Sequence, residues 1–430
     1  MRRRTVLPVA AALVVAALTV VLGAAAGGHR ATTQKNNPPG PATGPPIVLG
    51  MSAAFSGPSR GLGIELYRGS MAYLDEVNAH GGVNGRPVVI KAYDDGYNPA
   101  PAIYNTIRLI EQDHALVLFD YVGTPTVTRV LPLLKKYADK SILMFSPFSG
   151  AEPQREPPYE SLVFNLRASY RDETYGLVDR FVSIGRKRIA VFYQADAYGR
   201  SGWDGVRRAL AAHGLSLAAE ATYSRGTRYT THLTEQVDIL RRANADAVIA
   251  VGSYAACAAF IRDAVDAGWK VPIANLSFVG TENMVNLLVK EGQHTGRDYT
   301  SDLVNSEVVP SYEDLTLPAV VQYRDLMKQD HPSPPAIADV KGYDLLGDNF
   351  AGFEGFLNAK VMVEALRRIQ GDIVPAKLAA AFESIHDFDL GIDAPISFGP
   401  SQHQALQYVY YVHVDHGRLM PAVDWTRWTK

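Results

Sequence analysis

The chain has 430 residues, of which 47% are hydrophobic and 20% charged, and its formal net charge is −2. A chain of this length and composition can bury a large core and suggests two domains rather than one. The near-neutral charge, with both signs interspersed, argues against a nucleic-acid-binding surface. The single cysteine, Cys257, cannot form an internal disulfide, and its alanine-rich helical surroundings predict a buried, small apolar role.

The N-terminus is typical of an exported protein. Arginines at positions 2–4 precede an apolar run from Val6 to Leu22, and small residues follow up to Ala26. This order indicates a signal peptide over residues 1–26. A retained membrane anchor at residues 6–22 is the alternative, because the run is close to the length that spans a bilayer. Residues 27–45 are rich in Gly, Pro, Asn and Thr and predict a disordered linker.

The stretch that follows predicts a βαβ unit. Ile47 to Ala53 reads as an apolar strand, and apolar residues from Ile64 to Val77 recur at the spacing of one buried helical stripe. A second strand, Val88 to Tyr93, comes after two glycine turns and leads into a helix whose apolar residues end at Ile110. Strands joined in this way are parallel, and ligands bind at their carboxyl ends.

Strand-like and helix-like segments alternate along the rest of the chain. The further predicted strands are residues 116–119, 142–145, 188–193, 217–223, 247–251, 273–276 and, near the C-terminus, 408–414. A long helix is predicted at about 349–369, and the Pro- and Asp-containing residues 329–348 before it read as a surface elaboration. This repetition predicts the α/β class with two doubly wound sheets.

Several short motifs, in this order and spacing, resemble one family. They are F-S-G-P at residues 55–58, V-N-x-x-G-G-V-N-G at residues 77–85 and Y-D-D-G at residues 93–96. Residues 46–430 resemble type I periplasmic binding proteins, and among them the branched-chain-amino-acid-type, Leu/Ile/Val-binding-protein-like, substrate-binding proteins of ABC transporters. The resemblance implies two Rossmann-like lobes joined by a three-segment hinge.

Two breaks in the βα series, near residues 165 and 310, indicate two lobe boundaries, and the resemblance implies a third crossing between the lobes. We expect lobe I at residues 46–165 and 311–399, and lobe II at residues 166–310 and 400–430.

Strand ends of the first lobe supply candidate ligand-binding residues. Thr124 lies between a strand and a helix, where a hydroxyl and free N–H groups suit an anion. The resemblance implies that a Ser or Thr here touches the ligand, whereas a simple helix cap is the alternative. Phe148, Ser149 and Gly150 follow Ser-Pro after the next strand, where the family presents backbone and hydroxyl groups to the ligand head. An ordinary turn is the alternative.

The second lobe supplies aromatic candidates: Tyr170, Tyr198, Tyr254 and Phe278. Rings with a polar tip suit a pocket that is apolar in body and selective at one end, although packing is the alternative for any of 22 tyrosines. At Phe278 and Tyr170 the chain departs from the family, whose amino-acid binders carry acidic residues there. An α-amino group would lack its charge partner, so an aromatic, aliphatic or amide-like ligand fits better than an amino acid.

These features predict an extracytoplasmic solute-binding protein rather than an enzyme. It captures a small organic molecule (an amide, an aromatic or aliphatic acid, or an amino acid) by hinge closure and delivers it to an ABC permease. We expect Thr124, Phe148, Tyr198 and Tyr254 to converge on one solvent-accessible gap between the lobes.

No cofactor motif or metal-ligand pattern is found, and no nucleic-acid partner is expected. Asp94 and Asp95 read as turn residues rather than as a metal or acid–base pair. Two alternative functions remain. One is a ligand-sensing ectodomain for a membrane partner. The other is a serine hydrolase that uses Ser59, within Gly57-x-Ser-x-Gly61.

Overall fold

The computed structural model describes residues 40–430, and the predicted signal peptide lies outside the described residues. Residues 40–45, the described end of the predicted linker, are held by hydrogen bonds. The N–H of Ala42 donates to the carbonyl of Asn78 (2.9 Å), and the guanidinium of Arg86 donates to the carbonyl of Pro45 (2.8 Å). This part therefore departs from the predicted disorder.

The first lobe is built on a five-stranded sheet in the order β2-β1-β3-β4-β5, in which every neighbouring pair is parallel. Its strands are β1 (Ile47–Ala53), β2 (Val88–Asp94), β3 (Val117–Phe119), β4 (Met144–Phe145) and β5 (Val163–Phe164). Its helices are α1 (Arg60–Ala79), α2 (Pro99–Glu111), α3 (Thr124–Lys136), α9 (Pro318–Asp330), α10 (Phe350–Arg368) and α11 (Leu378–Glu383). Buried parallel strands covered by helices are expected of this class.

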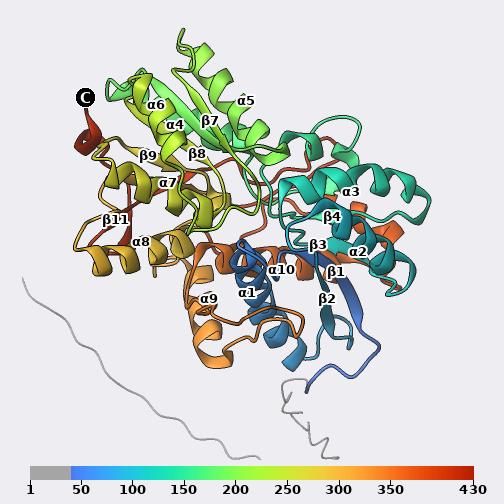
Figure 1. Ribbon diagram of the computed structural model, residues 1–430. Coiled ribbons are helices and arrows are strands. Elements are labelled where there is room, and N and C mark those ends of the chain that lie inside the picture. Colours follow the sequence, from blue (N-terminus) through green and yellow to red (C-terminus); the bar gives the residue numbers. More distant parts are fainter. Residues whose placement is uncertain (1–39) are drawn as a thin grey trace, which may run out of the picture. The chain divides into compact units, whose positions relative to one another are not determined.

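Helices α1 and α10 lie side by side in the first lobe (Figure 1). Glycines let their backbones approach closely. A Cβ atom added at Gly69 would lie 1.8 Å from the carbonyl oxygen of Gly352, and one added at Gly355 would lie 2.2 Å from the carbonyl oxygen of Leu66. The absence of side chains at these two positions thus sets the spacing of the two helices.

The second lobe is built on a seven-stranded sheet in the order β12-β11-β10-β9-β8-β6-β7. The C-terminal strand β11 pairs antiparallel with β10, as the predicted tail strand at 408–414 suggests, and β12 pairs antiparallel with β11. Its strands are β6 (Ile189–Gln194), β7 (Glu220–Tyr223), β8 (Ala247–Val251), β9 (Ile273–Asn275), β10 (Leu303–Glu307), β11 (Tyr410–Asp415) and β12 (Arg418–Pro421). Its helices are α4 (Tyr170–Ser183), α5 (Ala197–Ala212), α6 (Thr234–Arg242), α7 (Tyr254–Asp266) and α8 (Thr281–Thr295).

The chain crosses between the lobes three times, after β5, after β10 and before β11. Two crossings run side by side: the N–H of Asn165 donates to the carbonyl of His403 (2.7 Å), and the N–H of Leu406 donates to the carbonyl of Leu166 (3.0 Å). The prediction of two doubly wound α/β lobes with a three-segment hinge is confirmed. The residue numbers given above for the lobe boundaries remain a prediction.

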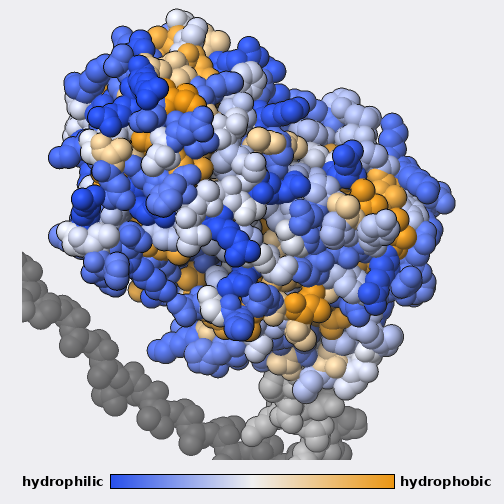
Figure 2. Space-filling view, in the orientation of Figure 1, coloured by the Kyte–Doolittle hydropathy of each residue, from blue (hydrophilic) through white to orange (hydrophobic). Residues whose placement is uncertain are grey.

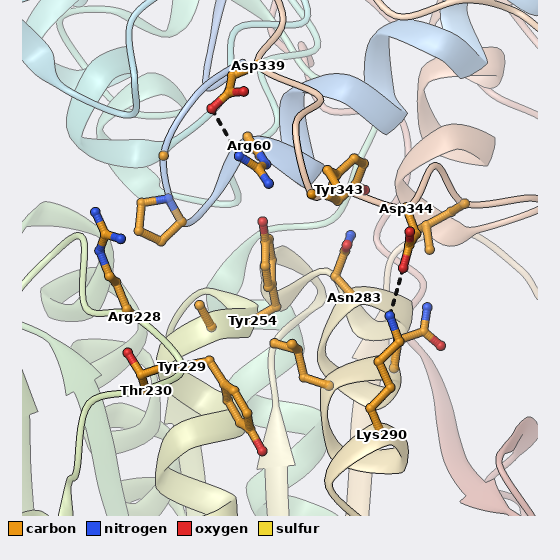
Figure 3. Close-up of a pocket in the computed structure, with 17 residues that line it drawn as sticks. Arg60, Arg228, Tyr229, Thr230, Tyr254, Asn283, Lys290, Asp339, Tyr343 and Asp344 are labelled. Carbon is orange, nitrogen blue, oxygen red and sulfur yellow. Dashed lines mark hydrogen bonds and ion pairs between the residues drawn. The ribbon is translucent and has the colours of Figure 1, made fainter.

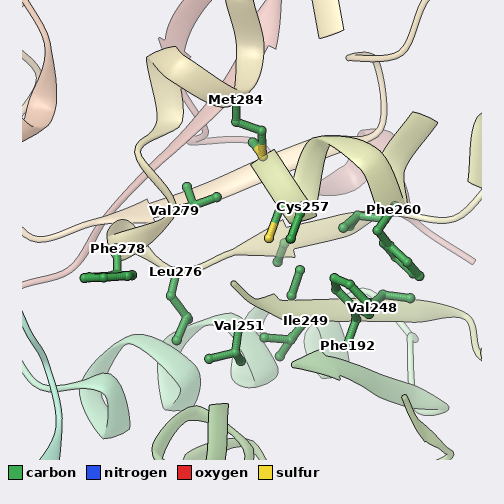
Figure 4. Packing of buried hydrophobic residues seen from close by; sticks show 14 of the residues in the cluster. Phe192, Val248, Ile249, Val251, Cys257, Phe260, Leu276, Phe278, Val279 and Met284 are labelled. Atoms are coloured by element: carbon green, nitrogen blue, oxygen red, sulfur yellow. The ribbon is translucent and has the colours of Figure 1, made fainter. Parts of the chain in front are cut away.

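Part of the core of the second lobe lies between its sheet and α7 (Figure 4). The ring of Phe192 stacks between those of Tyr223 (5.0 Å between centroids) and Phe260 (4.2 Å). Cys257 is fully buried in this core, as its alanine-rich surroundings predict, and burial raises the pKa of its thiol above the ordinary value. It therefore acts as a small apolar side chain.

Apolar side chains on the face shown in Figure 2 gather in small, separate patches among hydrophilic ones. Within residues 40–430, every helix is too short or too polar to cross a membrane.

Candidate functional site

The loops after β2, β3 and β4 all leave the carboxyl edge of the first sheet. Each holds a residue other than glycine with positive φ: Tyr97 (61°), Asp120 (52°) and Ser146 (45°). This left-handed conformation is uncommon for residues with a side chain, and such strain concentrates at functional sites. The same edge carries Thr124 and residues 148–150, which the sequence singles out.

Two carboxylates shape the loop after β2, as the sequence predicts. Asp94 accepts hydrogen bonds from two backbone N–H groups of the loop after β1 (2.9 and 3.2 Å). Asp95 accepts from the hydroxyl of Ser52 (2.7 Å) and from the N–H of Tyr97 (2.8 Å). Asp95 is almost fully buried, and loss of hydration raises the pKa of its carboxyl to about 7.

Asp95 should make the protein less stable as the pH rises toward neutrality. A carboxyl whose pKa is higher in the folded than in the unfolded state binds its proton more tightly when the protein is folded. Its contribution to the free energy of unfolding is therefore full at acid pH and is lost as the pH rises through 7. Relative to the wild type, Asp95→Asn should therefore gain about 2–3 kcal/mol of unfolding free energy between pH 5 and pH 8. Urea unfolding at a series of pH values measures this difference. A difference that does not change with pH would contradict the assignment.

The first predicted contact residues meet at the start of α3. The hydroxyl of Thr124 lies 2.8 Å from that of Ser149 and 3.4 Å from that of Tyr170. It does not cap the helix, whose N-cap residue is Gly123. Gly150 makes room for this arrangement, because a Cβ atom there would lie 2.5 Å from the ring of Tyr170. Predicted contact residues from both lobes therefore bring their hydroxyl groups together at the start of α3.

A cluster of five rings lies beside these hydroxyl groups, and we call it the aromatic cluster: Tyr97 and Phe148 from the first lobe, and Tyr170, Tyr198 and Phe278 from the second. Phe278 is central, with its ring centroid 4.6 Å from that of Tyr198, 5.5 Å from Phe148 and 5.7 Å from Tyr97. Tyr170 and Tyr198 are 5.1 Å apart. All five side chains are buried.

The expectation of a solvent-accessible gap lined by Thr124, Phe148, Tyr198 and Tyr254 is wrong for this conformation. The side chains of the first three are buried, and the rings of the aromatic cluster pack against one another across the two lobes. The lobes also touch directly. The N–H of Gly61 donates to the hydroxyl of Tyr254 (3.2 Å). Tyr254 lies apart from the aromatic cluster and lines a separate pocket.

Buried polar atoms in this region have unused hydrogen-bonding capacity. Among residues 40–430, the hydroxyl of Tyr198 has no hydrogen-bond partner, and neither do Nε and Nη1 of Arg167. A buried polar group without a partner costs free energy, so such groups need an explanation. Both residues contact the aromatic cluster: the ring of Tyr198 lies 5.1 Å from that of Tyr170, and the guanidinium of Arg167 lies 4.8 Å from the ring of Phe148.

Arg167 is a buried residue beside the aromatic cluster that the sequence reasoning did not single out. Its guanidinium carbon lies 4.8 Å from the ring centroid of Phe148, and its Nη2 donates to the hydroxyl of Ser277. Its nitrogens lie 3.5 Å from Glu354 on α10 and 3.7 Å from Glu173 on α4. Arg167 therefore connects the two lobes through charge. The available signal was an arginine between Leu166 and Ala168 at the predicted hinge.

Both carboxylates around Arg167 are buried. Loss of hydration raises the pKa of Glu354 to about 7, and Arg167 opposes that rise. Burial also raises the pKa of Glu173, which accepts hydrogen bonds from the N–H and hydroxyl of Ser277 (2.8 and 3.0 Å) and from the hydroxyl of Ser306 (2.6 Å). The carboxylate oxygens of Glu173 therefore already accept hydrogen bonds from residues of the protein.

A pocket of about 600 Å³ opens between the lobes at Tyr254 (Figure 3). The ring of Tyr254 rises from the start of α7 toward Arg60 of the first lobe, and the amide of Asn283 points into the same space (Figure 3). The lining residues are Gly57, Pro58, Arg60, Arg228, Tyr229, Thr230, Tyr254, Ala255, Asn283, Asn286, Leu287, Lys290, Asp339, Gly342, Tyr343, Asp344 and Leu346.

The loop between α9 and α10, residues 331–348, is more than the surface elaboration that the sequence suggested. Its Asp339 pairs with Arg60 (3.1 Å), and its Tyr343 donates to the buried Glu65 of α1 (3.0 Å). Its Asp344 pairs with Lys290 of the second lobe (2.7 Å). The loop thus forms one wall of the pocket and touches both lobes.

Comparison with known proteins assigns a family to most of the chain. The model of a family described as "Periplasmic binding protein" matches residues 46–418. An "Amino acid binding protein" of Pseudomonas aeruginosa is 27% identical over 225 residues, which are 52% of this chain and 58% of that protein. The alignment therefore spans less than two thirds of this curated relative.

Solved structures share the fold over nearly their whole length. A structure from Rhodopirellula baltica SH 1, described as "a possible leucine/isoleucine/valine-binding protein", is 30% identical with a TM-score of 0.78, and the match covers 89% of this chain and 98% of that one. A "substrate-binding periplasmic protein" from Ralstonia solanacearum is 26% identical with a TM-score of 0.73, with coverage of 86% and 97%.

Proposed function

Because the chain belongs to the periplasmic binding protein family, we propose that it captures a small organic molecule between its lobes, outside the cytoplasmic membrane, and delivers it to an ABC permease. The observation that carries the proposal is the meeting of Thr124, Ser149, Tyr170 and Tyr198 from two lobes, with the hydroxyl of Tyr198 left without a partner in residues 40–430. Hydroxyl groups beside packed aromatic rings suit a ligand with an apolar body and one polar end.

Hinge motion gives the ligand its route to these residues. The aromatic cluster is buried, so a molecule reaches it only when the lobes separate. A ligand that contacts the first lobe in the open form and both lobes in the closed form stabilises closure by the second set of contacts. A permease that recognises only the closed form would then receive loaded protein.

The ligand is an amide or an aromatic or aliphatic acid rather than an amino acid. Phe278 and Tyr170 supply rings where a buried ammonium group would need a carboxylate. Glu173, which lies near Arg167, accepts hydrogen bonds from two serines and is not available for an ammonium group. The proposed contact residues, in and beside the aromatic cluster, are Thr124, Phe148, Ser149, Gly150, Tyr170, Tyr198 and Phe278, whereas Tyr254 lines the separate pocket.

Tyr198→Phe separates a binding role from a packing role. The variant keeps the buried ring and removes only a hydroxyl group that has no partner within residues 40–430, so it should be more stable than the wild type by about 1 kcal/mol. It should also bind the ligand more weakly. Urea unfolding measures the first effect. A thermal-shift screen of small acids, amides and amino acids identifies the ligand and measures the second.

Tyr121→Phe is the matched control, because its buried hydroxyl lies 3.0 Å from that of Thr106. This variant should lose about 1 kcal/mol of stability and keep its ligand affinity. If Tyr198→Phe binds the ligand as tightly as the wild type, the hydroxyl of Tyr198 does not contact the ligand.

The two alternatives differ in their support. A ligand-sensing ectodomain would use the same cleft and close in the same way. N-terminal sequencing of the exported protein shows whether residues 6–22 are retained, and their retention would favour this alternative. For the serine hydrolase, the contacts offer no support. Ser59 is buried as the N-cap residue of α1, and its side chain forms no hydrogen bond with any histidine in residues 40–430.

A further inference from the structure

The pocket under the 331–348 loop has the size of a binding site in its own right. Its volume, about 600 Å³, lies within the range of cavities that hold small molecules. Of the predicted contact residues, only Tyr254 lines it. The pocket is open in the same conformation in which the aromatic cluster is closed, so it offers a place for a molecule that does not require the lobes to separate.

The charges around this pocket are unequal. Arg60, Arg228 and Lys290 face two carboxylates, Asp339 and Asp344. Each carboxylate is already paired, Asp339 with Arg60 and Asp344 with Lys290. Arg228 enters no ion pair or side-chain hydrogen bond with any part of the chain from residue 40 to residue 430. One guanidinium group is therefore free for an anion, and no free carboxylate is offered to an ammonium group.

The rest of the lining suits an apolar body with hydrogen-bonding groups at its edge. The ring of Tyr254 stands in the middle of the pocket, with Pro58 and Leu287 among the apolar walls. The amide of Asn283 adds a hydrogen-bonding group at the edge of the pocket, on the side of the Tyr254 ring away from Arg228 (Figure 3). A carboxylate binds a guanidinium group best, through two parallel hydrogen bonds.

Building on the proposed capture of small molecules, we propose that this pocket is a second binding site, which takes an organic monocarboxylate with an apolar body. The carboxylate lies against Arg228, and the apolar body lies on the ring of Tyr254. A zwitterionic amino acid binds poorly here, because both carboxylates of the lining are committed to Arg60 and Lys290.

Titration calorimetry with matched compounds tests this site. The compounds are benzoate and hexanoate, their amides benzamide and hexanamide, and L-leucine, each added to the wild type and to Arg228→Gln. The wild type should bind the acids in preference to the amides and to L-leucine, and Arg228→Gln should weaken acid binding about tenfold. Arg242→Gln, which changes an exposed arginine on α6 that does not line the pocket, should bind the acids as the wild type does.

Other outcomes overturn the second site while leaving the proposed function intact. Acid binding that is equal in Arg228→Gln and the wild type but lost in Tyr198→Phe would place the acid in the aromatic cluster. If only the amides or L-leucine bind, the protein captures small molecules, but the pocket at Arg228 is not a site for anions. If none of the five compounds binds, the monocarboxylate assignment is wrong, and the wider thermal-shift screen then decides whether the protein captures any small molecule.

Discussion

Gly69→Ala should destabilise the protein by about 3 kcal/mol or more, although alanine favours helices over glycine by about 1 kcal/mol. The added Cβ would lie 1.8 Å from the carbonyl oxygen of Gly352, and backbone cannot move aside as a flexible side chain does. Helices α1 and α10 would have to separate, and contacts along both would weaken. The clash therefore outweighs the gain in helix propensity.

Urea unfolding of Gly69→Ala measures the loss, and Gly399→Ala is its control. A Cβ atom at Gly399 meets nothing within 4 Å, so that variant should stay within about 0.5 kcal/mol of the wild type. Equal stability of Gly69→Ala and the wild type would show that the two helices can move apart freely.

Arg167→Met should cost about 3–5 kcal/mol at neutral pH, because it leaves Glu173 and Glu354 buried without their cation. The cost should shrink as the pH falls below 7. Burial raises the pKa of both carboxyls, so they take up protons and lose the charge that Arg167 compensates. Chemical unfolding at pH 5 and pH 8 measures both effects.

Arg171→Met is the comparison for Arg167→Met. Arg171 also pairs with carboxylates, among them Glu156 (2.5 Å), but its side chain is 34% exposed. Surface pairs contribute at most about 1 kcal/mol, so this loss should be small. If Arg167→Met and Arg171→Met lose similar amounts of unfolding free energy, the buried ion pairs of Arg167 do not hold the lobes together.

The order of elements was predictable where local chemistry decides it. Apolar strands such as β1 and β8, helical stripes and glycine turns follow from side-chain periodicity. Strand β10 (Leu303–Glu307) was missed because it contains Asn305, Ser306 and Glu307, all buried in the structure. Polar residues break the expected apolar run, and only their tertiary partners reveal why they are inside.

The candidate site was predictable in part. Thr124, Ser149 and Tyr170 come together because each stands at an element end on the inner edge of its lobe. The partners of Arg167 lie on α4 and α10, far away in sequence, so spacing could not name them. The closed packing of Phe148 and Phe278 likewise depends on how the lobes meet, which no local pattern encodes.

Small-angle X-ray scattering of the full protein, with and without the compound that raises its melting temperature most, tests the central claim most directly. Capture between the lobes predicts a smaller radius of gyration at saturation, because the ligand holds closed a hinge that otherwise opens. A compound that binds tightly while the scattering curve stays the same would contradict capture by closure.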